Sequence, residues 1–370
     1  MIQSREGLVA LVERLRGAET LGLDVEGDGL YRYRSRLCTM QIGDADSVAV
    51  VDTLAIEDLS PLEPILGEDG PRKVVHDVSF DRKMLATRDL GLARVFDTSV
   101  AARFLGEPAT GLAALLEARF EVKLDKKYQK ADWGERPLDD ARLAYLVADV
   151  HHLPALAAQL EEAAREHDIL EEIADETRYA MARSLMPEAE WAPWTRVKGG
   201  RDLGPDARAI LHALAEARED EAYAEDVPPF RVASNAVLFE AARRRPRTLR
   251  DLRRVRGLRR IPDEGLERAL REAKRDGPPA DEPVEAPPPP AVRAERKARE
   301  KSVTAWRKAE AEARGVDVQA VLPGHCLRDV CKITSPDAAS LAAVPGFGDK
   351  RASRYTDVLL GLLGDADVAD

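Results

Sequence analysis

Residues 21–31, LGLDVEGDGLY, decide the fold of the N-terminal part of the chain. The apolar run predicts a β-strand, and two acids, Asp24 and Glu26, lie close to its end. Because side chains of a strand alternate between its two faces, residues two apart share one face. The strand therefore presents a pair of carboxylates, which together could hold a divalent metal ion.

Further β-type runs surround this segment. LCTMQIG at 37–43, SVAVVD at 47–52 and RKVVHD at 72–77 alternate with helical stretches up to about residue 170. This pattern is typical of an α/β domain with a mixed sheet. We expect residues 1–170 to form this domain.

Two later segments carry acids that can join the first pair. In VVHDVSFDRKML, 74–85, a strand leads into a helix and Asp81 lies about one turn inside it, with Asp77 as the competing choice. The segment 136–153 is strongly helical, and Tyr145 and Asp149 are four residues apart, on one helical face.

Four carboxylates brought together would repel one another unless cations neutralised them. Hard oxygen ligands favour Mg²⁺ or Mn²⁺, so we infer two divalent metal ions held by Asp24, Glu26, Asp81 and Asp149. Two such ions can activate water and clamp a phosphate, while the Tyr145 hydroxyl orients the attacking water. Hydrolysis of a nucleic acid there would release nucleoside 5′-monophosphates.

The second half of the chain is predicted to be helical. A connecting helix and linker at 171–202 lead to a helical block at 203–275, a proline-rich acidic linker at 276–291 and a second block at 292–364. Both blocks contain a basic helix, then VPPF or VLPG, and later a glycine-containing turn, as in a degenerate tandem repeat.

Positive charge is concentrated locally although the formal net charge is −11. Residues 243–260 contain ten arginines, 123–138 contain four lysines beside Trp133, and VPGFGDKRASRY has glycines ahead of a basic helix, which suits phosphate binding. Trp133 is also interpreted as a packed anchor. The residues predicted to contact nucleic acid are Lys126, Lys127, Lys130, Arg136, Arg244, Arg247, Arg253, Arg254, Lys350 and Arg351.

Composition excludes several classes of protein. Three cysteines without CxxC spacing indicate reduced thiols and argue against a disulfide framework or a zinc site. The N-terminus lacks the uninterrupted apolar core of a signal peptide, and no run approaches about 18 apolar residues. We therefore expect a cytoplasmic, globular protein without membrane contact.

The motifs carry a family resemblance. DVE at 24–26, HDVSFD at 76–81, and DWGERPL followed by YLVAD at 132–149 resemble the tyrosine-type DEDD 3′–5′ exonucleases, specifically ribonuclease D, and the two helical blocks resemble HRDC domains. The resemblance implies a ribonuclease H-like fold with a five-stranded mixed sheet. It also implies a monomer that trims single-stranded 3′ ends of RNA, tRNA precursors among them.

Two departures and two alternatives accompany this resemblance. Gly27 stands where relatives commonly carry a bulky residue against the terminal base, and Asp28 is an additional acid, interpreted as a solvated turn residue with modulation of the metal site as the alternative. The alternatives are a 3′–5′ exonuclease acting on single-stranded DNA in repair, and an inactive nucleic-acid-binding scaffold. The presence of all four acids and Tyr145 argues against the scaffold.

Overall fold

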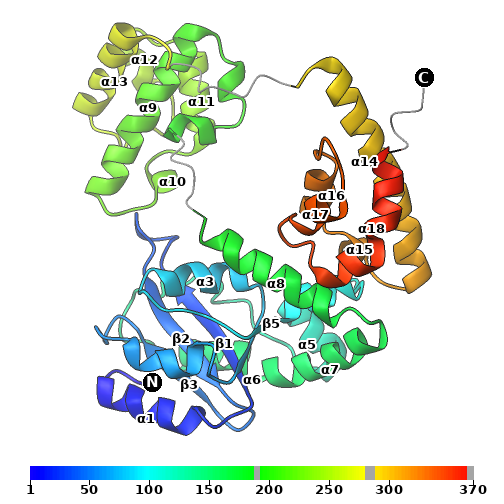
Figure 1. Ribbon diagram of the computed structural model, residues 1–370. Helices are drawn as coiled ribbons and strands as arrows, with labels where there is room; N and C mark the ends of the chain where they lie inside the picture. Colours follow the sequence, from blue (N-terminus) through cyan, green and yellow to red (C-terminus); the bar gives the residue numbers. More distant parts are fainter. Residues whose placement is uncertain (187–191, 280–287, 365–370) are drawn as a thin grey trace. The chain divides into compact units, whose positions relative to one another are not determined.

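The computed structural model describes residues 1–186, 192–279 and 288–364, which form two compact units (Figure 1). The sheet unit contains the described residues of 1–26, 37–186 and 288–364, and the helical unit contains those of 27–36 and 192–279. Parts of the linkers predicted at 171–202 and 276–291 lie outside the described residues. Within the described ranges, no helix has both the length and the apolar character needed to span a membrane.

The sheet unit is built on a five-stranded mixed sheet with the order β3-β2-β1-β4-β5. β1 pairs in parallel with β4, and β4 with β5, whereas β2 and β3 are antiparallel. This architecture confirms the predicted α/β fold with a mixed five-stranded sheet. The strands are β1 Thr20–Gly27, β2 Leu37–Gly43, β3 Val48–Asp52, β4 Arg72–Val75 and β5 Val95–Asp97.

Helices bury apolar side chains of this sheet in two separate cores. Val74 belongs to one core and its neighbour Val75 to the other, as the alternation of side chains along β4 requires. Leu23 packs with α1 and α3 in the second of these cores. The helices are α1 Arg5–Leu15, η1 Ser60–Leu62, α2 Glu63–Leu66, α3 Val78–Ala86, α4 Thr98–Phe104, α5 Leu112–Phe120, α6 Asp140–His151, α7 Leu153–Glu166 and α8 Leu170–Ser184.

The last helices of the chain also belong to the sheet unit. They have a core of their own, which includes Phe347 and Leu359, and α18 packs against α8 (Figure 1). α8, expected only as a connecting helix, also packs on α3 and β5 and so links the two sets of helices. The C-terminal helices are α14 Pro290–Arg314, α15 Val318–Val321, α16 Gly324–Val330, α17 Ala338–Ala342 and α18 Asp349–Gly364.

The helical unit has a separate core centred on α9. Residues 27–36 join it: the Tyr33 ring lies edge-on to Tyr223, with centroids 5.5 Å apart. Its elements are η2 Pro193–Arg196, η3 Gly200–Asp202, α9 Pro205–Ala224, α10 Pro229–Val232, α11 Asn235–Arg243, α12 Leu249–Arg253 and α13 Asp263–Asp276.

The surroundings of Asp28 differ from the predicted solvated turn. Its carboxylate is fully buried and accepts hydrogen bonds from the Arg36 backbone N–H at 2.7 Å and from Arg36 Nε at 2.8 Å. The interpretation as a solvated turn residue is therefore wrong. Asp28 closes the 28–36 loop by accepting from the backbone N–H and the half-exposed side chain of Arg36, a contact that seven intervening residues hide from sequence reasoning.

Candidate active site

Three elements bring the predicted acids together at one edge of the sheet. β1 supplies Asp24 and Glu26, which point to the same face, and α3 supplies Asp81 from its first turn. α6 packs on β2 and β3 and supplies Tyr145 and Asp149. The sequence left Asp77 and Asp81 as alternatives, and Asp81 is the one that is buried and electrostatically coupled to Asp24.

The carboxylates have the geometry of a cation site. Ligand oxygens of Asp24, Glu26 and Asp149 all lie within 4.8 Å of one another. Asp81 is only 2% exposed, and its Oδ2 atom has no hydrogen-bond partner. A buried carboxylate oxygen without a donor is costly, and a divalent cation would satisfy it. Residues Asp24, Glu26, Asp81 and Asp149 therefore fit a divalent metal site.

Electrostatics agree with this assignment. Burial, with the nearby Asp149, raises the pKa of Asp24 to about 7, and burial with Asp24 and Asp149 raises the pKa of Glu26 to about 9. Burial also raises the pKa of Asp149 to about 6, and burial together with Asp24 raises that of Asp81. Without a cation these groups retain protons at pH values where an exposed carboxyl is ionised.

Tyr145 is fixed by aromatic neighbours. Its ring stacks on Trp133, with centroids 5.8 Å apart and 29° between planes, and meets Tyr128 edge-on at 5.8 Å. Its hydroxyl hydrogen-bonds with Asp149, and burial raises the phenol pKa. Trp133 is 1% exposed, so it is a packed anchor for Tyr145 rather than a stacking platform for a base.

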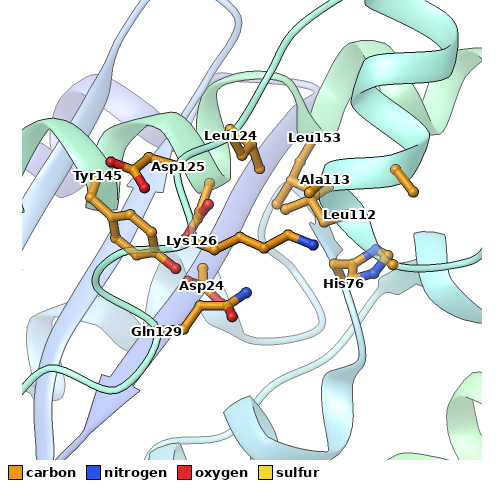
Figure 2. Close-up of a pocket in the computed structure, with 13 residues that line it drawn as sticks. Asp24, His76, Leu112, Ala113, Leu124, Asp125, Lys126, Gln129, Tyr145 and Leu153 are labelled. Carbon is orange, nitrogen blue, oxygen red and sulfur yellow. The ribbon is translucent and has the colours of Figure 1, made fainter.

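A cavity of about 310 Å³ opens beside the acids (Figure 2). Figure 2 shows Lys126 extending across it toward His76, with Gln129 next to Asp24. Leu112, Leu124 and Leu153 form an apolar wall. Sequence reasoning missed Gln129 and this wall, because these residues belong to no recognisable motif, and it gave His76 no role in the site although His76 begins the HDVSFD motif.

The other cations predicted near this site have different surroundings. Lys127 and Lys130 are exposed, and the Lys127 ammonium lies 5.0 Å from the Tyr128 ring centroid. Arg136 makes two hydrogen bonds to Asp52, at 2.7 and 2.8 Å, and donates to the carbonyls of Cys38 and Trp133. These bonds give Arg136 a structural role in holding the segment that precedes α6.

Arginines of the helical unit are partly engaged with neighbouring acids. Arg244 donates to Glu240 at 2.8 Å, and Arg253 pairs with Asp263 and donates to two carbonyls. Arg254 and Arg247 are exposed at the surface. Arg253 is thus held within its own fold, while Arg247 and Arg254 remain accessible to a phosphate.

The glycine-containing turn of the second block faces α8. A Cβ atom on Gly348, which has φ +77°, would lie 1.7 Å from an oxygen of Asp175. Lys350 pairs with Asp168 at 2.9 Å, and Arg351 is fully buried. The prediction that Arg351 contacts nucleic acid is wrong, because no phosphate can reach a buried guanidinium. The basic start of α18 holds the C-terminal helices on α8.

Removing metal should make the sheet unit sensitive to alkaline pH. The folded pKa values of Asp149, Asp24 and Glu26, about 6, 7 and 9, exceed unfolded values near 4, so folding binds protons. Proton binding by these three carboxyls adds to the free energy of unfolding. This contribution is complete below about pH 4 and is lost as the pH rises through the folded pKa values. We expect the unfolding temperature in EDTA to fall from about pH 5.5 to about pH 8.5 in calorimetry, and Mg²⁺ to restore it. A flat profile unaffected by Mg²⁺ would contradict this.

Comparisons with known proteins agree with this geometry. A family model described as 3′–5′ exonuclease matches residues 1–164, and a model of the HRDC domain matches residues 207–261 and 296–363. The exonuclease match contains the acids and Tyr145, and the two HRDC matches fall within the two helical blocks.

Individual relatives cover most of the chain. The chain is 33% identical over 269 residues to ribonuclease D of Zymomonas mobilis, and the match covers 70% of this chain and 67% of that protein. It is 30% identical over 254 residues to ribonuclease D of Escherichia coli, covering 68% of each. The crystal structure of the Escherichia coli exoribonuclease has a similar fold, with a TM-score of 0.72 and 24% identity over 99% of this chain and 98% of that one.

Proposed function

This chain belongs to the ribonuclease D family and is a 3′–5′ exoribonuclease, and we propose that it trims single-stranded 3′ ends of tRNA precursors and other structured RNAs. It would act as a monomer in the cytoplasm and release nucleoside 5′-monophosphates. The observation that carries this proposal is the convergence of Asp24, Glu26 and Asp149 within 4.8 Å beside a cavity of about 310 Å³.

The acids are the metal-binding part of the proposed mechanism. Two divalent ions, Mg²⁺ or Mn²⁺, would be held by Asp24, Glu26, Asp81 and Asp149. Both metals prefer oxygen ligands such as these carboxylates. Bound there, such ions lower the pKa of water and neutralise charge on a scissile phosphate. Because the pKa values of these carboxyls are raised in the absence of a cation, ion binding must release protons, so activity should increase with pH over the neutral range.

Tyr145 controls the orientation of the attacking water. Because its pKa is raised, the phenol stays protonated and its hydroxyl can both donate and accept a hydrogen bond. Stacking on Trp133 fixes the ring, and Asp149 fixes the hydroxyl. A water held by this hydroxyl would lie in a fixed direction relative to the phosphate.

Substrate positioning would use the cavity and the exposed cations. Lys126 offers an ammonium to a backbone phosphate, and Gln129 offers an amide next to Asp24. The apolar wall suits a nucleobase. Arg247 and Arg254 of the helical unit would bind the upstream part of the RNA, adding affinity through a second attachment.

The test is a 5′-labelled 3′-tailed tRNA and a single-stranded DNA of the same tail sequence, each incubated with protein in Mg²⁺ or EDTA. We expect a ladder of shortened RNA in Mg²⁺ and none in EDTA. Stronger laddering of the DNA would favour the repair exonuclease, and no cleavage in Mg²⁺ or Mn²⁺ would favour the scaffold.

Replacing Tyr145 by phenylalanine should reduce kcat by about 10²-fold, because the attacking water loses the hydroxyl that orients it. The ring and its packing on Trp133 remain and only the hydrogen bond to Asp149 is lost, so the unfolding temperature should change little. Tyr223→Phe is the matched control because Tyr223 is 66% exposed in the helical unit. A Tyr145→Phe enzyme as fast as the wild type would remove Tyr145 from the mechanism.

A further inference from the structure

Asp97 is a buried acid that takes no part in the proposed metal cluster. It is the last residue of β5 and is 1% exposed. Its Oδ1 atom accepts hydrogen bonds from the backbone N–H groups of Asp77, Ser99 and Val100 at 3.0, 2.9 and 3.3 Å, and its Oδ2 atom accepts from Val78 N–H at 2.9 Å. One carboxylate thus accepts hydrogen bonds from backbone N–H groups at the starts of both α3 and α4.

The start of α3 needs this support. Asp77, its N-cap residue, has φ 68° and ψ 77°, in the left-handed region that is uncommon for residues other than glycine, although aspartate enters it more often than most. Its own side chain makes no capping hydrogen bond. Strained backbone persists only where the surroundings hold it, and Asp97 accepts from two successive N–H groups, those of Asp77 and Val78, which flank the Asp77 Cα atom.

The turn that Asp97 holds places an essential acid. Asp81 follows Asp77 by four residues, about one helical turn, so the start of α3 sets the position of its carboxylate. The Asp81 side chain is buried beside Asp24, and its Oδ2 atom lacks a partner within the protein. It therefore has little freedom to correct a shift of its helix.

We propose that Asp97 is a positioning residue that acts through the strained Asp77 turn to hold Asp81 at the metal cluster. This inference rests on the proposed metal-dependent function. Asp97 does not touch substrate or metal. Its role is to fix one of the four carboxylates, and its loss lowers metal affinity and kcat while leaving RNA binding outside the cluster unchanged.

The test is Asp97→Asn in the full chain, which keeps side-chain size but replaces one acceptor oxygen by an amide N–H. Binding of Mn²⁺ alone is measured by electron paramagnetic resonance of the free ion. We expect the half-saturating Mn²⁺ concentration to rise about 10- to 100-fold, the usual cost of losing a residue that orients a ligand. RNA affinity in EDTA should stay at the wild-type value.

Asp337→Asn is the matched control. Asp337 is an exposed N-cap of α17 whose side chain accepts from Ser340 N–H at 2.7 Å, so the same chemical change weakens a helix start outside the cluster. It should lower the unfolding temperature without changing Mn²⁺ binding. An equal loss of Mn²⁺ affinity in both variants, or none in Asp97→Asn, would overturn the role of Asp97.

Two further results separate the possible failures. Wild-type protein that binds no Mn²⁺ would refute the proposed function itself, whatever the variants do. Should Asp97→Asn not fold, the double variant Asp97→Asn/Asp77→Gly takes its place, because glycine adopts the left-handed turn without strain. Because the turn then needs no support, its half-saturating Mn²⁺ concentration is expected to return toward the wild-type value, and a value that stays raised would overturn the role of the strained turn.

Discussion

Asp24→Asn should lower kcat for RNA hydrolysis by more than about 100-fold, beyond the usual cost of losing a residue that only orients a metal ligand. That factor corresponds to about 2.7 kcal/mol of activation free energy. Asp24 is in the group of three acids within 4.8 Å, and its charge also raises the pKa of Asp81, so its loss removes an interaction with each of the other three acids. Single-turnover kinetics in saturating Mg²⁺ measure the effect.

The same variant should not destabilise the metal-free protein. Removing one of several like charges relieves repulsion among Glu26, Asp81 and Asp149, so the unfolding temperature in EDTA at about pH 8 should rise. The control is Asp46→Asn, which alters an exposed acid in the β2–β3 turn. It should change neither kcat nor the unfolding temperature in EDTA. An inactive Asp24→Asn that is also unstable in EDTA would indicate misfolding rather than loss of a ligand.

Local patterns were sufficient to predict the acids of this site. The period of two along β1 places Asp24 and Glu26 on one face, and the spacing of four on α6 does the same for Tyr145 and Asp149. Each pair is defined within a few residues of chain. The mixed sheet and the two helical blocks likewise followed from alternating strand and helix signals and from a family resemblance.

Sequence reasoning was weakest where a side chain's partner is distant in the chain. Arg351 looked like an exposed phosphate ligand, but its contacts include Ala320 and Glu172, which are 31 and 179 residues away. Asp28 depends on Arg36 and was read as solvated for the same reason. A run of charged residues in the sequence does not show which of them are exposed. Only the tertiary fold decides which charged groups are neutralised inside the protein.

Asp97 is an intermediate case. The segment VFDTS, at 95–99, carries a recognisable signal, an aspartate between a strand and a helix, which predicts a cap for α4. Its second role, accepting from Asp77 and Val78 at the start of α3, depends on the parallel pairing of β4 with β5, which sets Val75 beside Asp97. No pattern within one segment could show it.

Arg351→Met should destabilise the C-terminal helices by about 3–5 kcal/mol, the cost of removing one partner of the buried contact between Arg351 Nη1 and Asp175 Oδ2 at 4.0 Å. Arg351 Nε donates to the Ala320 carbonyl at 3.1 Å, and its Nη1 donates to those of Gly346 and Phe347 at 3.2 Å each. Methionine fills similar volume but donates nothing, so these carbonyls lose their buried donor. Unfolding in urea, monitored by circular dichroism, measures the loss of unfolding free energy. Hydrogen exchange shows which helices lose stability.

The contrast with a surface charge makes this prediction specific. Lys308→Ala removes an ion pair to Glu312 in which both side chains are more than two-thirds exposed, at 74% and 71%, and should leave the unfolding midpoint unchanged. Hydrogen exchange in Arg351→Met should increase first in α18 and then in α8, the helix it docks against. Because α8 also packs on α3, which carries Asp81, a loss of Mn²⁺ affinity in this variant would show that the C-terminal helices support the active site. Unchanged Mn²⁺ affinity despite an unfolded α18 would show that α3 is held by Asp97 and the sheet alone.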